Sequence, residues 1–220
     1  MSADSTPLTK ALLLSFEGSE GCGKSTQIKL LREHLIAQGL RVEVLREPGG
    51  SAIGEAIRHL LQHSSEGEAL VPEAELLLFA ASRAQLVREK IVPLLRAGVW
   101  VILDRFVDST TVYQGVGRDL PRRSIEVVNG LATGGLMPDL TFLLDLPVAE
   151  ANRRIAQSRR ELDRMERQPV TFFERIRAGY HDLARADSQR IRVIDAMPEP
   201  SEVHATILQH LTPHLHGSPS

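Results

Sequence analysis

Five strand-like apolar runs alternate with amphipathic segments along the chain, and this order restricts the fold more than any other feature. The runs occupy residues 11–16, 41–46, 98–104, 140–146 and 190–195. Strands that alternate with helical segments form parallel sheets, and continuously apolar strands are covered by helices on both faces. We therefore predict an α/β fold with three layers, in which helices flank a five-stranded parallel sheet.

Length and composition favour one globular domain. A chain of 220 residues with 42% hydrophobic content can bury a sizeable core, and we expect a single domain over 11–214 between flexible tails at 1–10 and 215–220. The formal charge of -2 gives no overall basic field, so we expect no nucleic-acid partner and no membrane partner. The N-terminus lacks a signal-peptide layout and no apolar run approaches the roughly 18 residues that span a bilayer, which makes the cytoplasm the expected location.

The first apolar run leads directly into GSEGCGKS, residues 18–25, which matches the pattern G-x-x-x-x-G-K-[ST] between a strand and a helix. Glycines at this spacing let backbone N–H groups surround phosphates at the positive end of the helix dipole. Lys24 is expected to reach the β and γ phosphates of ATP, and the Ser25 hydroxyl to ligate Mg²⁺. The loop residues expected to bind ATP are Gly18, Ser19, Gly21, Cys22, Gly23, Lys24, Ser25 and Thr26.

This loop predicts a P-loop NTPase fold but does not choose among switches, motors and kinases. The strings N-K-x-D and D-x-x-G do not occur in the sequence, which disfavours a guanine-nucleotide switch. A short, slightly acidic chain is also unlike a DNA-dependent motor. A small-molecule kinase is the leading hypothesis, and a P-loop binding or regulatory protein without rapid turnover is the alternative. Cys22, the single cysteine, excludes an internal disulfide and most simply fills a small-residue position in the loop.

Acids and arginines follow other strand-like runs. Ligands of parallel sheets gather at the carboxyl ends of the strands. Asp104 and Arg105 end the third run, where the acid can hold Mg²⁺ and the guanidinium can bind phosphate. Arg46 and Glu47 follow the second run. The alternatives are an ion pair that only ties strand to helix at 104–105, and a simple turn at 46–50.

Phe79 and Arg83 lie four residues apart, and therefore on one face of a predicted helix. An aromatic ring beside a guanidinium suits a planar base that forms hydrogen bonds. A core phenylalanine with a solvated arginine at the helix edge is the alternative.

Seven motifs, in order along nearly the whole chain, resemble those of the bacterial thymidylate kinases, a family of P-loop nucleoside monophosphate kinases. They are FEGSEGCGKST, REPGG, FAASRAQL, DRFVDSTTVYQGVGR, PDLTFLLDLP, ELDRMERQ and VIDA. The resemblance implies transfer of the γ-phosphate of ATP to dTMP, with Mg²⁺, giving dTDP and ADP for dTTP synthesis. It also implies a homodimer, for which a long apolar helix expected over 72–97 can serve. The same apolar face can instead belong to the internal core.

The resemblance assigns roles around the acceptor. Glu20 would bind the 3′-hydroxyl of the sugar, and Tyr113 would occupy the space of a ribose 2′-hydroxyl. Phe79 would stack on thymine, with Arg83 on a base carbonyl. The full set implied for dTMP is Glu20, Arg46, Glu47, Arg58, Phe79, Arg83, Arg105, Thr110, Tyr113 and Gln114, of which Arg58 and Arg105 would clamp the phosphate. Catalysis would use Lys24, Arg105 and Asp104, and the metal would contact Ser25 and Asp104.

The resemblance also implies an arginine-rich lid at approximately 153–169, which must supply the catalytic arginine because the P-loop contains none. Arg159 is the first choice, followed by Arg160 and Arg154. A solvated helix with Glu–Arg pairs is the alternative for this segment. After the last strand, Ala196 and Met197 are expected to line the adenine pocket, unless they only form the turn that leaves the strand.

Overall fold

The computed structural model describes residues 11–157 and 162–215, and it contains one parallel sheet of five strands in the order β2-β3-β1-β4-β5. The strands are β1 (Leu13–Glu17), β2 (Val42–Arg46), β3 (Trp100–Asp104), β4 (Leu140–Asp145) and β5 (Ile191–Asp195). The predicted sheet is therefore confirmed. Because β1 lies between β3 and β4, the loop that follows it opens at the middle of the carboxyl edge.

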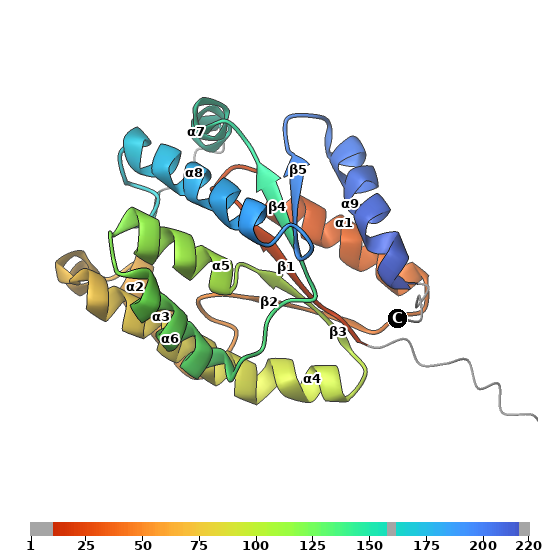
Figure 1. Ribbon diagram of the computed structural model, residues 1–220, viewed down its shortest axis with the longest axis horizontal. Coiled ribbons are helices and arrows are strands. Elements are labelled where there is room, and N and C mark those ends of the chain that lie inside the picture. Colours follow the sequence, from red (N-terminus) through yellow and green to blue (C-terminus); the bar gives the residue numbers. More distant parts are fainter. Residues whose placement is uncertain (1–10, 158–161, 216–220) are drawn as a thin grey trace, which may run out of the picture.

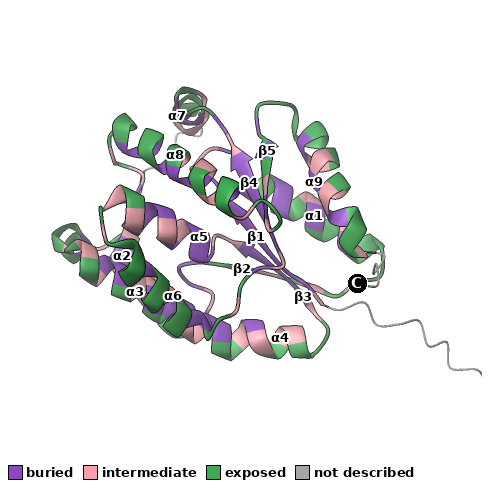
Figure 2. Cartoon of the chain, viewed as in Figure 1, coloured by how far each residue is buried: buried purple, intermediate pink, exposed green. Residues whose placement is uncertain are grey.

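Helices cover both faces of the sheet (Figure 1). The α-helices are α1 (Lys24–Ala37), α2 (Ala52–Gln62), α3 (Pro72–Leu86), α4 (Val92–Arg96), α5 (Val107–Thr110), α6 (Arg122–Thr133), α7 (Val148–Gln157), α8 (Val170–Ala186) and α9 (Pro200–Leu215). Helices α1 and α9 pack on one face, whereas α3, α5 and α8 lie on the other. The strands between them are mostly buried, and the outer sides of the helices are exposed (Figure 2). This is the three-layer arrangement that the alternating pattern predicts.

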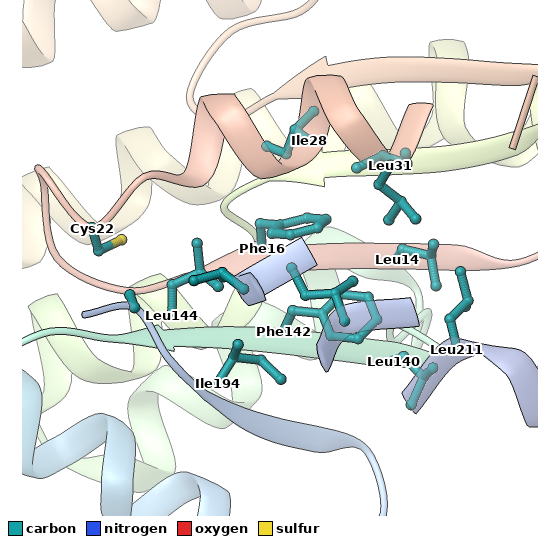
Figure 3. Packing of buried hydrophobic residues seen from close by; sticks show 14 of the residues in the cluster. Leu14, Phe16, Cys22, Ile28, Leu31, Leu140, Phe142, Leu144, Ile194 and Leu211 are labelled. Atoms are coloured by element: carbon teal, nitrogen blue, oxygen red, sulfur yellow. The ribbon is translucent and has the colours of Figure 1, made fainter. Parts of the chain in front are cut away.

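Side-chain alternation in β1 builds two cores. Leu14 and Phe16 point toward α1 and α9, where the rings of Phe16 and Phe142 lie 5.2 Å apart between centroids (Figure 3). Leu13 points the other way and packs with Leu103 beneath α3. Both faces of this strand are fully buried, so its position and the start of the following loop are strongly fixed.

The helix expected over 72–97 is divided. A π-helical turn, Val87–Ile91, joins α3 to α4, and Pro93 lies two residues after its end. Proline has no N–H to donate and its ring collides with the carbonyl four residues before it in a regular α-helix. A wider turn before Pro93 relieves this collision, which explains the local change in winding. At the other end of the chain, α9 ends at Leu215 and so includes the first residue of the tail expected at 215–220. The rest of that tail and the tail expected at 1–10 lie outside the described residues.

Candidate active site

The loop between β1 and α1 has the backbone that phosphate binding requires. Gly18 and Gly21 have φ angles of 130° and 77°, in the region that favours glycine. A Cβ atom on Gly21 would lie 2.8 Å from the carbonyl oxygen of Ala151, and one on Gly18 would lie 2.5 Å from that of Leu144. Gly23 is the N-cap of α1 and brings no side chain, so the first N–H groups of the helix face the loop. These close approaches explain why only glycine fits at both places.

Lys24 folds back over this loop. Its Nζ donates to the carbonyl oxygens of Ser19 at 3.0 Å and Gly18 at 3.2 Å, and it lies 3.9 Å from a carboxylate oxygen of Glu20. Cys22 is buried at the edge of the core beneath the loop (Figure 3), as its small size predicts. The ammonium is therefore held at the floor of the cleft in which phosphates would lie.

Two cavities meet beside the loop. The first is lined by Gly21, Gly23, Lys24, Ser25, Thr26, Arg46, Arg58, Asp104 and Arg154, among others. The second is lined by Phe79, Arg83, Thr110, Tyr113 and Gln114, among others. Both cavities share the side chains of Glu20, Glu47, Gln62, Arg105, Asp163 and Glu166. One cavity is thus rich in phosphate-binding groups, the other has an aromatic and amide lining, and they are continuous.

Arg105 occupies the junction of the two cavities. Its φ angle of 69° is uncommon for a residue with a side chain and turns the chain sharply after β3. The guanidinium forms an ion pair with Glu20, donates to Ser109 Oγ at 3.1 Å, and lies 5.2 Å from the ring centroid of Tyr113. Asp104, the last residue of β3, lines the phosphate-side cavity with Ser25. The pair 104–105 therefore does more than tie a strand to a helix.

Arg83 is buried rather than solvated, with 1% of its surface exposed, so the solvated arginine considered as an alternative is wrong. Its Nε donates to Glu47 at 2.8 Å, its Nη1 to Asn129 at 2.7 Å, and its Nη2 to Thr110 at 2.9 Å. Phe79 is half-buried and lines the second cavity. The sequence motif FAASR therefore places its aromatic ring and its guanidinium at one cavity, as predicted.

Glu47 is a buried carboxyl group at the same junction. Burial raises its pKa to about 7, although the guanidinium of Arg83 acts in the opposite direction. Within 11–157 and 162–215, its Oε1 atom has no hydrogen-bond partner. The neighbouring Arg46 is half-exposed and donates to Glu55 at 2.8 Å, while Arg58 donates to the carbonyl oxygen of Pro48 at 3.1 Å. The segment 46–50 is therefore part of the cavity wall and not a simple surface turn.

Sequence reasoning missed Glu17, the last residue of β1. Its carboxylate is fully buried and accepts hydrogen bonds from the backbone N–H of Phe106 at 2.8 Å, from Ser109 Oγ at 2.6 Å and from the Tyr180 hydroxyl at 2.9 Å. Burial raises its pKa, and the charge of Asp108 acts in the same direction. Glu17 thus fixes the backbone next to Arg105. An acid at the end of a buried strand was the available signal, because strand ends carry the site.

Two further acids, Asp163 and Glu166, also escaped prediction although they lie in the motif ELDRMERQ. Each backbone N–H donates to the other side chain, at 3.0 Å and 2.9 Å, so the two carboxylates are held together at the mouth of both cavities. Burial raises the pKa of Asp163. Glu75 was missed as well, and it binds Arg164 of the same segment at 2.6 Å.

The arginine-rich segment does not behave as one group. Arg153 and Arg154 pair with Glu150 on α7 at 2.7 Å and 2.8 Å, which matches the Glu–Arg alternative. Arg154 also donates to the carbonyl oxygen of Ala196 at 3.1 Å. Met197 beside it is half-exposed. Arg159 and Arg160 lie outside the described residues.

Other classes of site are not found in the described part of the chain. No group of three or more His, Cys, Asp or Glu side chains there is arranged to hold a metal without a ligand. None of the helices within 11–157 and 162–215 has the length and apolar character of a membrane span.

Comparisons with known proteins agree with this geometry. Residues 16–207 match the family model for thymidylate kinase. A thymidylate kinase from Thermoanaerobacter sp. is 45% identical over 206 residues, covering 94% of this chain and all of the relative, and one from Chlorobaculum parvum is 47% identical over 208 residues, covering 91% and 95%. The crystal structure of thymidylate kinase from Ehrlichia chaffeensis superposes with a TM-score of 0.74 at 32% identity, covering 92% of this chain and 98% of that one. The chain belongs to the thymidylate kinase family.

Proposed function

We propose that this protein transfers the γ-phosphoryl group of ATP to dTMP, giving dTDP and ADP for dTTP synthesis. The observation that carries the proposal is the pair of cavities that meet at Arg105, one with a P-loop and the other with an aromatic and amide lining. A phosphate donor and a nucleoside monophosphate would lie end to end across this junction. Family membership supports the same reaction.

On the donor side, the loop N–H groups and Lys24 would hold the β and γ phosphates. Ser25 and Asp104 offer hydroxyl and carboxylate oxygens in the same cavity, and oxygen donors are the ligands that Mg²⁺ prefers, so they fit the ion. Bound Mg²⁺ would neutralise phosphate charge. Phosphoryl transfer needs little covalent chemistry from the protein, so the work of these groups is alignment and electrostatic stabilisation.

On the acceptor side, Arg58 and Arg105 would clamp the phosphate of dTMP, with Arg46 and Glu47 arranging the surrounding charge. Glu20 lies at the junction, where we propose that it accepts the 3′-hydroxyl once Arg105 turns to the phosphate. The ring of Tyr113 lies against Arg105 and would therefore meet the sugar. This placement supports exclusion of a ribose 2′-hydroxyl by contact.

The base would lie against Phe79, within reach of Thr110 and Gln114. The donors of Arg83 are largely engaged, since Nη2 donates to both the Phe106 carbonyl oxygen and Thr110. Nη1 carries two hydrogens and uses one for Asn129, so its second hydrogen is the one we assign to a carbonyl oxygen of thymine.

The catalytic arginine is assigned to the lid at approximately 153–169. Arg159 is our first choice, followed by Arg160 and Arg154; the contact of Arg154 with the Ala196 carbonyl oxygen supports a place beside the adenine pocket formed with Met197. Arg159→Ala should lower turnover much more than dTMP affinity, because the contact strengthens in the transition state. Loss of dTMP binding alone, with turnover retained at saturation, would contradict this role.

We further propose a homodimer through α3 and α6. Leu77, Val127 and Leu131 are exposed by 57%, 64% and 78% on the outer sides of these packed helices, and α6 is mostly exposed in Figure 2. Light scattering tests this proposal, and a monomeric mass at assay concentration would contradict it. The cytoplasm, where ATP and dTMP are available, is the proposed location.

A coupled ADP-release assay across dTMP, dUMP, UMP, CMP and AMP tests the reaction itself. We expect a strong preference for dTMP, and a preference for CMP or AMP would instead indicate another kinase on this scaffold. Lys24→Ala is expected to abolish ATP-dependent turnover. If this variant lost ATP binding while the wild type showed no acceptor-dependent turnover, the protein would be a nucleotide-binding regulator and not a kinase.

A further inference from the structure

Glu75 is a buried carboxylate of α3 that contacts Gln114, which lines the base cavity, and Arg164 of the segment 162–168. It is 1% exposed, and it accepts hydrogen bonds from the Gln114 amide nitrogen at 2.9 Å, from Arg118 Nε at 3.2 Å and from Arg164 Nη2 at 2.6 Å. Arg164 is itself buried and also donates to the carbonyl oxygen of Leu61 at 2.8 Å. In each of these hydrogen bonds Glu75 is the acceptor and its partner is the donor.

The two guanidinium groups keep Glu75 ionised. Burial alone would raise its pKa, but the hydrogen bonds and charges of Gln114, Arg118 and Arg164 hold the pKa below its ordinary value. An ionised carboxylate accepts hydrogen bonds and donates none. The Gln114 side chain must therefore turn its NH₂ group toward Glu75, since its carbonyl oxygen would be repelled there.

This orientation leaves the amide oxygen of Gln114 for the base cavity. Gln114 lines that cavity, and within the described ranges its Oε1 atom accepts no hydrogen bond. Thymine carries a hydrogen on N3 and matches an acceptor at this place, whereas N3 of cytosine carries a lone pair and would face the oxygen unfavourably. The remaining Nη1 hydrogen of Arg83 likewise suits a carbonyl oxygen better than the amino group of cytosine.

We propose that Glu75 is a specificity-determining positioning residue, which fixes the Gln114 amide so that the cavity selects a pyrimidine bearing N3–H over cytosine. The inference rests on the proposed function, because it assumes that this cavity holds the base of dTMP. Glu75 acts through Gln114 and does not touch the base. Arg118 and Arg164 serve by keeping the carboxylate charged, which links base selection to the docking of segment 162–168.

The test compares kcat/KM for dTMP and dCMP in the wild type and in Glu75→Gln. A glutamine at 75 can accept as well as donate, so the Gln114 amide becomes free to turn and offer N–H to cytosine. We expect the dTMP-to-dCMP ratio to fall by about tenfold, the value of one hydrogen bond of roughly 1.4 kcal/mol, with the KM for ATP unchanged. Glu73→Gln, an exposed position on the same helix, is the matched control and should keep the wild-type ratio.

A double variant, Glu75→Gln with Gln114→Glu, exchanges donor and acceptor without changing the total charge. The glutamine then donates to the new carboxylate, which offers only acceptors to the cavity, so the ratio should return toward the wild-type value. Equal losses of kcat/KM for both nucleotides in Glu75→Gln would indicate a merely structural role and overturn the proposal. A double variant that keeps the lowered ratio would overturn it as well.

If Glu75→Gln does not fold, as judged by circular dichroism, the wild type is tested with dTMP methylated at N3. Binding weakened by tenfold or more supports an acceptor at this place, and binding equal to dTMP overturns the proposal. The two levels of failure are distinct. A wild type that does not phosphorylate dTMP refutes the proposed function and this inference with it, whereas a dTMP kinase whose ratio is unaffected by Glu75→Gln refutes this inference alone.

Discussion

Replacing Glu47 with glutamine is expected to stabilise the ligand-free protein at alkaline pH and to leave its stability nearly unchanged at acidic pH. Burial raises the pKa of this carboxyl group from 4.5 to about 7 in the folded state. A folded-state pKa above the unfolded one means that the protonated group contributes its full stability below about pH 4.5. That contribution is lost as the pH rises through about 7. The difference between the two pKa values corresponds to a loss of about 3 kcal/mol in the free energy of unfolding, at roughly 1.4 kcal/mol for each pH unit.

Glutamine retains an oxygen that can accept from Arg83 Nε but carries no charge to bury. Urea unfolding of both proteins at pH 5, 6, 7, 8 and 9 gives the difference in unfolding free energy, and this difference cancels the titration of groups that both proteins share. It should rise from below about 1 kcal/mol at pH 5 to about 3 kcal/mol at pH 9. The exposed Glu73→Gln variant serves as the control and should show no such rise.

A difference for Glu47→Gln that does not change with pH would refute the reasoning. It would mean that Glu47 is ionised throughout, with Arg83 compensating fully for its burial. A difference that grows toward acidic pH would refute it more directly, because it would place the folded-state pKa below the unfolded one. In either case the unpartnered Oε1 atom would need another explanation.

Three further changes test the framework of the site. Gly21→Ala should lower the unfolding free energy by about 1–3 kcal/mol and should weaken ATP binding, as measured by titration, because its Cβ would meet a carbonyl oxygen at 2.8 Å with φ at 77°. The control Gly130→Ala, which has open space around it on a helix, should lower neither the unfolding free energy nor the ATP affinity. Asp108→Asn should cost about 1–3 kcal/mol in urea unfolding, since it breaks the two-bond ion pair between buried Asp108 and half-buried Arg190. Glu17→Gln should cost about 1–3 kcal/mol by the same assay, because one of the two oxygens that accept from the Phe106 N–H and the Ser109 hydroxyl becomes an amide nitrogen, which cannot accept. An unchanged free energy in any of the three would contradict the corresponding contact.

The sheet could be predicted for two reasons. The hydrophobic periods of strands and helices differ, and the apolar runs place hydrophobic side chains on both faces of the sheet, as strands covered by helices on both sides require. The order β2-β3-β1-β4-β5 was not predicted, whereas the loop after β1 is a local pattern that dictates its own backbone. The division of the helix between α3 and α4 was not predicted. The residues of that stretch all favour a helix. Only Pro93, whose ring would collide with the carbonyl four residues before it in a regular α-helix, indicates a wider turn there.

The acids of the site show where sequence reasoning ended. Their strand-end positions place Glu17, Glu47 and Asp104 at one edge of the sheet, but no pattern in the sequence tells which cation each acid meets. Pairings such as Arg83 with Glu47 join residues 36 positions apart, and they depend on how α3 packs. The charges could be located from the sequence, whereas their partners required the fold.

This distinction matters for the loop acid Glu20. In an isolated loop, a carboxylate among phosphate-binding N–H groups would oppose the ligand. In the folded protein it lies between Lys24 and Arg105, so its charge offsets two cations that would otherwise repel each other across the junction. In the proposed reaction, a substrate phosphate that arrives there would take over one cation while Glu20 would turn to a neutral hydroxyl. If the proposed function holds, the acid lets the site keep its cations in place before either substrate binds, and the free energy needed to assemble them comes from folding and not from substrate binding.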